Sequence, residues 1–200
     1  MEKYNKIYSS SNISEDIKPS QILNLIWKSF LPGSKVLDLG CGQGSDALFL
    51  AKNNFSVTAI DSSLVAISHI KIKKNEFKFN NIELICGNIE DFNIEKDKYQ
   101  IIICRNVLNF LNKNKALKIL NNLRNNIQKG GYIIIEAFTK NDPSFFSNNK
   151  FNSYFNEQEL LNFFFGHKII YYLENIILDL GHPGFPGLHK HGVARIIIQK

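Results

Sequence analysis

Apolar and polar residues alternate along this chain in blocks, and some of the blocks are short, continuous apolar runs. These runs are rich in β-branched and aromatic residues and end at glycine or at a polar residue, as buried strands do. We predict strands over residues 36–39, 55–60, 82–86, 99–104 and 132–138.

The other kind of block separates these strands and has helical spacing. Apolar residues recur three and four positions apart over 46–52, 64–77 and 113–128, and the last of these ends at Lys-Gly-Gly, a helix stop. Strands that alternate with helices form a parallel sheet covered on both faces. We therefore predict a doubly wound, Rossmann-like α/β fold.

Both ends of the chain depart from this alternation. Residues 19–30 are predicted as a helix over one edge of the sheet, and 156–165 as a helix with Asn156 as its cap and Glu159 at its third position. Residues 168–173, extending toward 177, and 193–199 are two more strands with no helix between them, so they are antiparallel. The sheet is then seven-stranded and mostly parallel, with an antiparallel last strand.

Length and composition favour one domain over residues 1–200, because 200 residues with 44% hydrophobic content suffice for a single core. Residues 139–155 are polar and aromatic and contain Asp-Pro and Asn-Asn, so we assign them to a lid insertion. No apolar run is long enough to span a membrane, and the polar start lacks a secretory signal. Three cysteines in apolar or glycine-rich segments indicate reduced thiols in a cytoplasmic protein.

The formal charge of +6 does not change this picture. Only three of the 24 basic residues are arginines, and lysine, asparagine and isoleucine are abundant throughout, which indicates a compositional bias. The densest basic cluster, residues 71–78, is typical of the solvated face of a helix. We therefore expect no nucleic-acid partner.

The segment "VLDLGCGQG" carries the strongest candidate chemistry. Gly40, Gly42 and Gly44 lie between a predicted strand and helix, where they permit a tight turn and a close approach of a cofactor to the backbone. Asp61 lies 21 residues beyond Gly40 at the end of the second strand, where a carboxylate can accept both hydroxyls of a ribose. Capping of the following helix is the alternative for Asp61.

A nicotinamide cofactor suits this loop less well. The third glycine of a GxGxxG motif is replaced by Ser45, and Asp38 would put a negative charge beside a pyrophosphate. An ammonium or sulfonium group would instead be stabilised by Asp38. An NAD-dependent oxidoreductase and a regulatory domain that binds a cofactor without chemistry remain the two alternatives.

The ordered motifs resemble those of class I S-adenosylmethionine-dependent methyltransferases along nearly the whole chain. "VLDLGCGQG" is similar to their first motif, "AIDSS" to the ribose motif, "CGNIEDF" to the adenine segment, and "YQIIICRNVLNFL" to the fourth strand. The resemblance implies S-adenosylmethionine as cofactor, with Asn88 toward the adenine amine and Ile89 against its ring; for Asn88, a simple turn residue is the alternative. The cofactor residues it implies are Tyr4, Tyr8, Asp38, Gly40, Cys41, Gly42, Gly44, Asp61, Ser62, Asn88, Ile89, Cys104 and Arg105.

Within that superfamily the chain most resembles small methyltransferases of the tellurite-resistance type. "YNKIY" is similar to their tyrosine-rich entry segment, so the resemblance implies that residues 1–31 cover the cofactor site. "GLHKHGVARIIIQK" is similar to their histidine-bearing ending. Ser45 stands where that group carries an arginine, so the resemblance implies methyl transfer to a small molecule without specifying tellurite. An anionic chalcogen compound or a thiol is the expected acceptor, and a monomer or homodimer the expected assembly.

The stretch "GHPGFPGLHKHG" holds His182, His189 and His191 and joins the last two predicted strands. It is either a hairpin loop with solvated histidines or an acceptor site in which one histidine contacts the substrate or acts as a base. A metal site is the third alternative, and since no acidic residue or cysteine lies in the loop, we expect no metal.

The candidate catalytic residues are thus His189, His191 and Arg105, which would bind an anionic acceptor or orient it. Arg195 could help, although an exposed strand position is its favoured interpretation. The aromatic residues of the lid either roof a small pocket or seal the sheet edge; they are Phe145, Phe146, Phe151, Tyr154 and Phe155.

Overall fold

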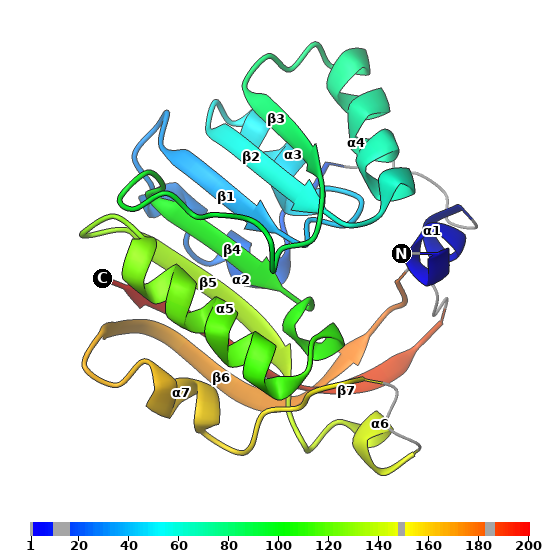
Figure 1. Ribbon diagram of the computed structural model, residues 1–200, viewed down its shortest axis with the longest axis vertical. Coiled ribbons are helices and arrows are strands. Elements are labelled where there is room, and N and C mark those ends of the chain that lie inside the picture. The colour runs from blue at the N-terminus through cyan, green and yellow to red at the C-terminus, as the bar shows by residue number, and fades with distance from the viewer. Residues whose placement is uncertain (1, 10–16, 148–150, 183–186) are drawn as a thin grey trace.

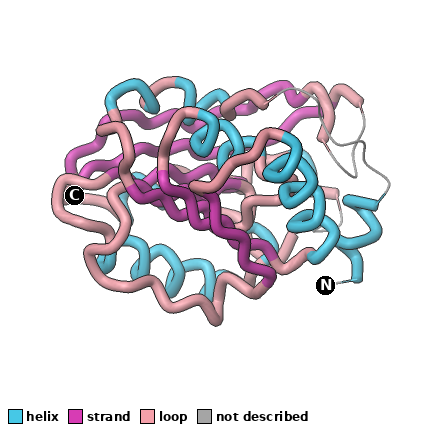
Figure 2. The backbone as a smooth tube through the Cα atoms, turned by 90° about the horizontal axis from the view of Figure 1, so that it is seen from above, coloured by secondary structure: helices cyan, strands magenta, loops and turns pink. Residues whose placement is uncertain are grey.

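A computed structural model describes residues 2–9, 17–147, 151–182 and 187–200 of the chain. Its centre is one seven-stranded sheet in the order β3-β2-β1-β4-β5-β7-β6 (Figure 1). Seen from above, the strands form a middle layer with helices on both sides (Figure 2). The predicted fold class is therefore confirmed.

The first five strands are parallel to one another, and β7 is antiparallel to both of its neighbours, β5 and β6. Bulky isoleucines fill the central strands, as expected for strands that are buried on both faces. The strands are β1 (Lys35–Leu39), β2 (Ser56–Asp61), β3 (Ile82–Cys86), β4 (Ile101–Arg105), β5 (Tyr132–Phe138), β6 (Lys168–Asp179) and β7 (His189–Gln199).

Two hydrophobic cores lie on the two faces of this sheet. The core on one face includes residues of η2, α5 and α7, and that on the other includes residues of α2, α3 and α4. The helices are α1 (Glu2–Ser9), α2 (Gln21–Asn24), η1 (Trp27–Ser29), α3 (Ser45–Lys52), α4 (Leu64–Glu76), η2 (Leu108–Phe110), α5 (Lys113–Asn126), α6 (Pro143–Phe146) and α7 (Glu159–Phe163). None of the described helices is long and apolar enough to cross a lipid bilayer.

Two of the predicted helices are shorter than expected. The stretch 19–30 divides into α2 and η1, because Ile26 between them leaves the helical region with φ −131°. In the stretch 156–165 the helix starts only at Glu159, since Gln158 before it has φ +57°. The expected bond between the cap and the third position still forms, as the Asn156 amide donates to Glu159 Oε2 at 2.8 Å.

The last two strands are longer than predicted and form a long hairpin that extends past the parallel strands. β6 continues to Asp179 and β7 already begins at His189, opposite Asp179. Since β7 runs against β5, its first residues lie at the carboxyl ends of the parallel strands. The histidines thus lie at the ligand-binding edge of the fold.

The Lys-Gly-Gly stop joins α5 to β5 through two glycines with different constraints. Gly130 has φ +79° and open space around it, and its amide donates to the Lys200 carbonyl at 2.8 Å. A Cβ at Gly131 would lie 2.7 Å from the Gln100 carbonyl oxygen and 2.9 Å from that of Gln128. Backbone atoms cannot move aside as a flexible side chain can, so only Gly131 is required for packing.

We expect Gly131→Ala to lower the free energy of unfolding by about 1–3 kcal/mol, since an added methyl group must displace packed backbone. The matched variant Gly130→Asn should cost less, because asparagine tolerates a positive φ and the space is open. Urea unfolding followed by circular dichroism measures both. Equal losses would contradict the packing argument.

Candidate active site

The glycine loop between β1 and α3 is held by the end of β2. Gly40, Gly42 and Gly44 all have positive φ, at +70°, +53° and +81°. The amides of Gly40 and Cys41 both donate to the Ile60 carbonyl, at 2.8 and 3.0 Å. The Gly42 amide donates to Asp61 Oδ2 at 2.9 Å. The loop is therefore held in place by hydrogen bonds within the protein.

Packing around the loop also requires glycine. A Cβ at Gly40 would lie 2.5 Å from Val107 Cγ2, and one at Gly44 would lie 2.6 Å from Ile70 Cγ1. A Cβ at Gly42 would lie 2.9 Å from the Tyr8 hydroxyl oxygen. The N-terminal helix α1 thus comes within contact distance of the loop.

Asp61 binds two backbone amides and keeps further accepting capacity. Oδ2 accepts from Gly42, and Oδ1 accepts from the Ser63 amide at 2.8 Å. An ionised carboxylate has about four lone-pair sites, so each oxygen retains room for another donor. Ser63, whose Oγ accepts from the Ala66 amide, caps α4. The alternative that Asp61 is the helix cap is therefore wrong.

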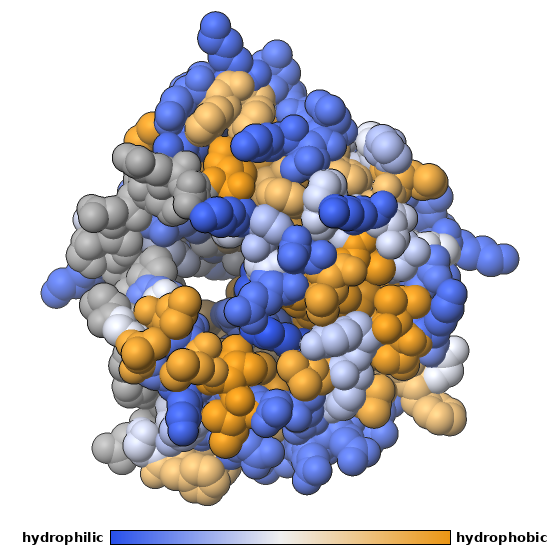
Figure 3. Space-filling view, turned by 180° about the vertical axis from the view of Figure 1, so that it is seen from behind, coloured by the Kyte–Doolittle hydropathy of each residue, from blue (hydrophilic) through white to orange (hydrophobic). Residues whose placement is uncertain are grey.

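Helix α1 is tied to this region by a second contact. Ser63 Oγ donates to Asn5 Oδ1 at 2.7 Å, which joins α1 to the start of α4. No sequence motif indicates Asn5, and only the packing of α1 identifies it. Of the two predicted tyrosines, Tyr8 lies beside Gly42, while the side chain of Tyr4 falls outside the described part of the structure. Figure 3 shows a hollow on the side of the molecule where Figure 1 places α1.

Asp38 is a buried carboxyl group beneath the loop. Burial, together with the negative charge of Asp46, raises its pKa from 3.8 to about 8, against the opposing effect of Arg105. Burial likewise raises the pKa of the Cys41 thiol well above its usual value. Asp38 is thus a group that a nearby cation would ionise.

Arg105 and Arg195 belong to a buried ionic network. Arg105 donates to Asp46 Oδ2 at 2.7 Å and contacts Glu136 Oε1 at 3.5 Å, and Arg195 donates from Nε to Glu136 Oε2. These ion pairs raise the pKa of Arg105 although burial alone would lower it. Arg195 is only 9% exposed, so its interpretation as an exposed strand residue is wrong.

The remaining predicted cofactor residues lie around the ends of β2, β3 and β4. Asn88 is exposed and donates to Asp91 Oδ2 at 3.3 Å, in a segment that the Gly87 amide ties to the Asp61 carbonyl. Ile89 is buried in the core, and Ser62 is half-buried next to Asp61. The Cys104 side chain is fully buried, so only its backbone can face a ligand.

The three histidines of the terminal stretch converge. His189 Nε2 lies 3.3 Å from His182 Nε2 and 2.9 Å from His191 Nε2. Asp179, opposite His189 in the hairpin, joins them, and ligand atoms of all four residues lie within 4.8 Å of one another. His191 Nδ1 contacts Asp142 Oδ2 at 2.9 Å. Neither aspartate was predicted from the sequence, because both lie outside the loop.

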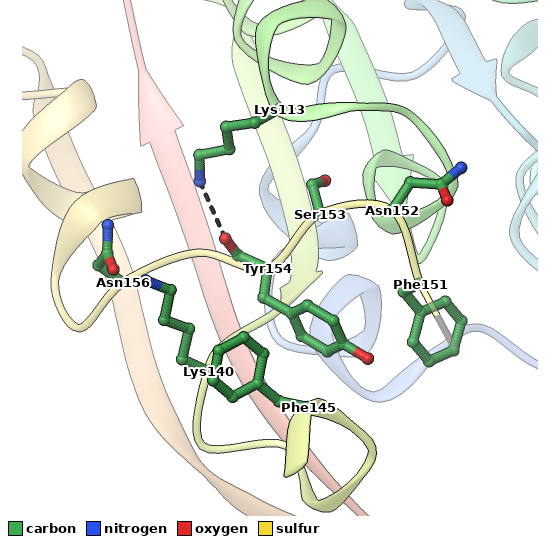
Figure 4. Close-up of a pocket in the computed structure, with 8 residues that line it drawn as sticks. All are labelled: Lys113, Lys140, Phe145, Phe151, Asn152, Ser153, Tyr154 and Asn156. Carbon is green, nitrogen blue, oxygen red and sulfur yellow. Dashed lines mark hydrogen bonds between the residues drawn. The ribbon is translucent and has the colours of Figure 1, made fainter. Parts of the chain in front are cut away.

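The aromatic residues of the lid segment lie partly in the core and partly at a cavity. Phe155 is fully buried, Phe146 is 78% exposed, and Phe145, Phe151 and Tyr154 pack together on Phe138 and Val193. Phe145, Phe151 and Tyr154 also line a cavity of about 330 Å³, together with Lys113 and Lys140 (Figure 4). Some of these aromatic residues thus seal the sheet edge, and some line a cavity. This cavity shares no lining residue with the glycine loop.

Known proteins are similar to this chain over more than half of its length. The family described as tellurite resistance protein TehB matches residues 2–182. A probable S-adenosyl-L-methionine-dependent methyltransferase TehB from Haemophilus influenzae is 32% identical over 140 residues, which cover 64% of this chain and 47% of that protein. A ubiquinone biosynthesis O-methyltransferase from Rickettsia typhi is 32% identical over 114 residues, 56% of this chain and 44% of that protein.

The crystal structure of TehB from Haemophilus influenzae superposes with a TM-score of 0.75 at 27% identity. That match covers 98% of this chain and 65% of the crystallised one. The chain spans about half the length of the curated relatives it matches.

Removing one charge from the buried ionic network should be costly. We expect Glu136→Gln to lower the free energy of unfolding by about 3–5 kcal/mol, because two guanidinium groups lose a buried partner. Glu95→Gln, which breaks an exposed pair with Lys98, serves as control and should change little. Chemical denaturation of both variants measures the difference, and equal stabilities would contradict a structural role for the network.

Proposed function

Because this chain belongs to the TehB family of tellurite resistance proteins, we propose that it is an S-adenosylmethionine-dependent methyltransferase acting on a small molecule. One observation carries the proposal: a glycine loop in positive-φ conformation is hydrogen-bonded to Asp61 above the buried carboxyl group of Asp38. Such a loop accepts a cofactor against its backbone, and both acidic groups suit a cofactor with ribose hydroxyls and a positive charge.

The residues present fit this cofactor. Asp61 retains lone pairs for two ribose hydroxyls, and Asn88 and Ile89, held next to Asp61 through Gly87, are proposed to contact the adenine. Because the pKa of Asp38 is raised, a cationic group beside it would stabilise its ionised form. We assign Asp38 to the end of the cofactor that carries the methionine ammonium group. Tyr8 and α1 are proposed to cover that end. The covering segment expected over residues 1–31 includes residues 1 and 10–16, which lie outside the described part of the chain.

When bound, the cofactor supplies an activated methyl group on a positively charged sulfur. The protein must hold the acceptor in line with that group and exclude water. Helix α1, tied to Ser63 and lying on Gly42, is suited to excluding water. The Cys41 thiol remains protonated at neutral pH because burial raises its pKa, so it is not assigned a nucleophilic role.

We propose an anionic chalcogen compound or a thiol as the acceptor. A chalcogen oxyanion or a thiolate is bound as an anion and needs no general base, so the protein has to supply only positive charge or hydrogen-bond donors. A thiol must first lose its proton to become the thiolate. The guanidinium groups of Arg105 and Arg195 are already paired with Asp46 and Glu136, so Arg105 is proposed to position the loop. His189 and His191 stay as the proposed acceptor contacts.

Asp61→Ala should weaken S-adenosylmethionine binding at least about tenfold, because a hydrogen bond to a charged group contributes roughly 1.5–3 kcal/mol. Calorimetric titration of the variant measures this loss. Glu76→Ala, on α4 away from the loop, is the control and should bind as the native protein does. Unchanged affinity in Asp61→Ala would remove the ribose assignment.

Binding of the cofactor should depend on pH through Asp38. The free protein holds a proton on Asp38 up to a pKa of about 8, and a cationic ligand favours the ionised form, so binding releases that proton. Affinity should therefore rise by up to about tenfold per pH unit below that pKa and level off above it. The charged groups that act on Asp38 are Asp46, Arg105 and Asp61, and the ion pairs of Arg105 raise its pKa, so it stays a cation in this range.

Calorimetric titrations between about pH 6 and 9 test this dependence. A carboxyl group with the ordinary pKa of about 3.9 would be ionised throughout that range and would give a flat profile. Asp38→Asn should flatten the profile and lower the affinity at the alkaline end. A profile that keeps its slope in Asp38→Asn would exclude Asp38 as the group responsible.

The same titrations separate the two alternatives. Binding of S-adenosylmethionine and its demethylated product, with methyl transfer to an acceptor in a panel of thiols and chalcogen oxyanions, supports the enzyme. Binding without turnover over that panel would favour a regulatory domain, and preferential binding of NAD would favour an oxidoreductase.

A further inference from the structure

Three imidazole rings meet where β6 ends and β7 begins. His182 lies three residues after Asp179, the end of β6, and His189 and His191 are the first and third residues of β7. Alternate residues of a strand lie on the same side, so His189 and His191 face one way. All three rings present their Nε2 atoms to one another, with separations of 3.3 and 2.9 Å from His189.

The hydrogen bonds of the opposite ring nitrogens define the tautomers. His189 Nδ1 lies 2.8 Å from the Gly187 carbonyl oxygen, which can only accept, so Nδ1 carries the hydrogen. His191 Nδ1 lies 2.9 Å from Asp142 Oδ2, which also accepts from the Gly192 amide at 3.0 Å. In the neutral rings both Nε2 atoms are therefore unprotonated and direct lone pairs at each other over 2.9 Å. A cation between them would relieve this repulsion.

The spacing suits a metal ion. Zinc–nitrogen bonds of about 2.0–2.1 Å in tetrahedral geometry place neighbouring ligand nitrogens about 3.3 Å apart. The distance from His189 Nε2 to His182 Nε2 is 3.3 Å, and that to His191 Nε2 needs to open by a few tenths of an ångström. A carboxylate oxygen of Asp179 lies close enough to supply a fourth ligand.

The surroundings hold two of the rings in place. Asp142 binds His191 Nδ1 and is itself fixed by the Ser144 amide at 2.8 Å. The His191 ring stacks on Phe138 with centroids 4.4 Å apart, and only 8% of the residue is exposed. Metal-binding histidines characteristically donate their second nitrogen to a carboxylate or a backbone carbonyl, and His191 and His189 do so here.

We infer that His182, His189 and His191, with Asp179, form a binding site for a divalent transition-metal ion of the zinc type. Imidazole and carboxylate ligands suit Zn²⁺, and these four protein ligands would close its coordination. In the zinc-bound protein, His189 and His191 would therefore be metal ligands and would not contact the acceptor directly. The loop alone argued against a metal because it holds no acidic residue. Asp179 from β6 supplies the carboxylate ligand, and Asp142 from the lid segment supplies the carboxylate that binds His191 Nδ1.

The test uses the full chain, stripped of metal with a chelator, and Zn²⁺ as the titrant in calorimetry. We expect one ion per chain with submicromolar affinity, and Co²⁺ in its place should show the visible absorption of a four-coordinate ion. His182→Ala and His189→Ala should weaken Zn²⁺ binding by more than about 100-fold, and Asp142→Asn by about 10–100-fold, as partners of ligands do. His167→Asn, outside the cluster, should bind as the native protein does.

Circular dichroism and thermal unfolding of the metal-free variants establish that each is folded before titration. The residues proposed to hold S-adenosylmethionine are not ligands here, so cofactor affinity should be unchanged in His182→Ala. Absence of Zn²⁺ binding in the micromolar range would overturn the site and leave a proton shared between His189 and His191. Binding that persists equally in His182→Ala, His189→Ala and His167→Asn would also overturn it.

Discussion

The hydrogen bond from the Gly42 amide to the Asp61 carboxylate joins the two parts of the chain on which the proposed cofactor site depends. It connects the turn after β1 to the end of β2, and the Ile60 carbonyl strengthens the connection by accepting two more amides of the loop. The same carboxylate binds the Ser63 amide at the start of α4. One acidic side chain therefore fixes the loop and the next helix in relation to each other, which reduces the ordering that a bound cofactor has to impose.

A second constraint lies behind the loop, where charged groups are buried. Burial of a charge is costly unless it is paired, and the network from Asp46 through Arg105 and Glu136 to Arg195 pairs each of its members. It links the first turn of α3 to β4, β5 and β7, so the glycine loop is held from below as well as from the side. Asp38 lies outside these ion pairs, and burial together with the negative charge of Asp46 raises its pKa. Because the arginines pair within this network, the histidines are the groups that we propose as contacts of an acceptor or of a metal ion.

Antiparallel β7 gives the molecule its second cluster of polar residues. Because β7 runs against β5, a segment near the end of the sequence returns to the edge where the parallel strands end. The pairing of β6 with β7 places Asp179 opposite His189, and the lid segment brings Asp142 to His191. The proposed zinc site would thus fasten β6, β7 and the lid segment at one point beside the proposed methyl-transfer site.

The sequence by itself determined the order of strands and helices, the mostly parallel sheet and the glycine loop with Asp61. Those features depend on local periodicity, on breakers and on motif spacing, which are visible along the chain. It misplaced the start of the helix after the lid, because Gln158 adopts a positive φ that composition does not indicate. It also interpreted Arg195 as exposed, although β7 carries this residue into contact with Glu136.

Only the tertiary structure decided which residues join the loop and the histidines. Asn5 meets Ser63, Tyr8 meets Gly42, and Asp142 meets His191 across 58, 34 and 49 positions of the chain. No short-range pattern encodes such contacts, because they arise from the packing of α1 and the lid onto the sheet. Local sequence sets the conformation of each segment, while the chemistry of a site depends on distances between segments, and those exist only once the sheet has formed.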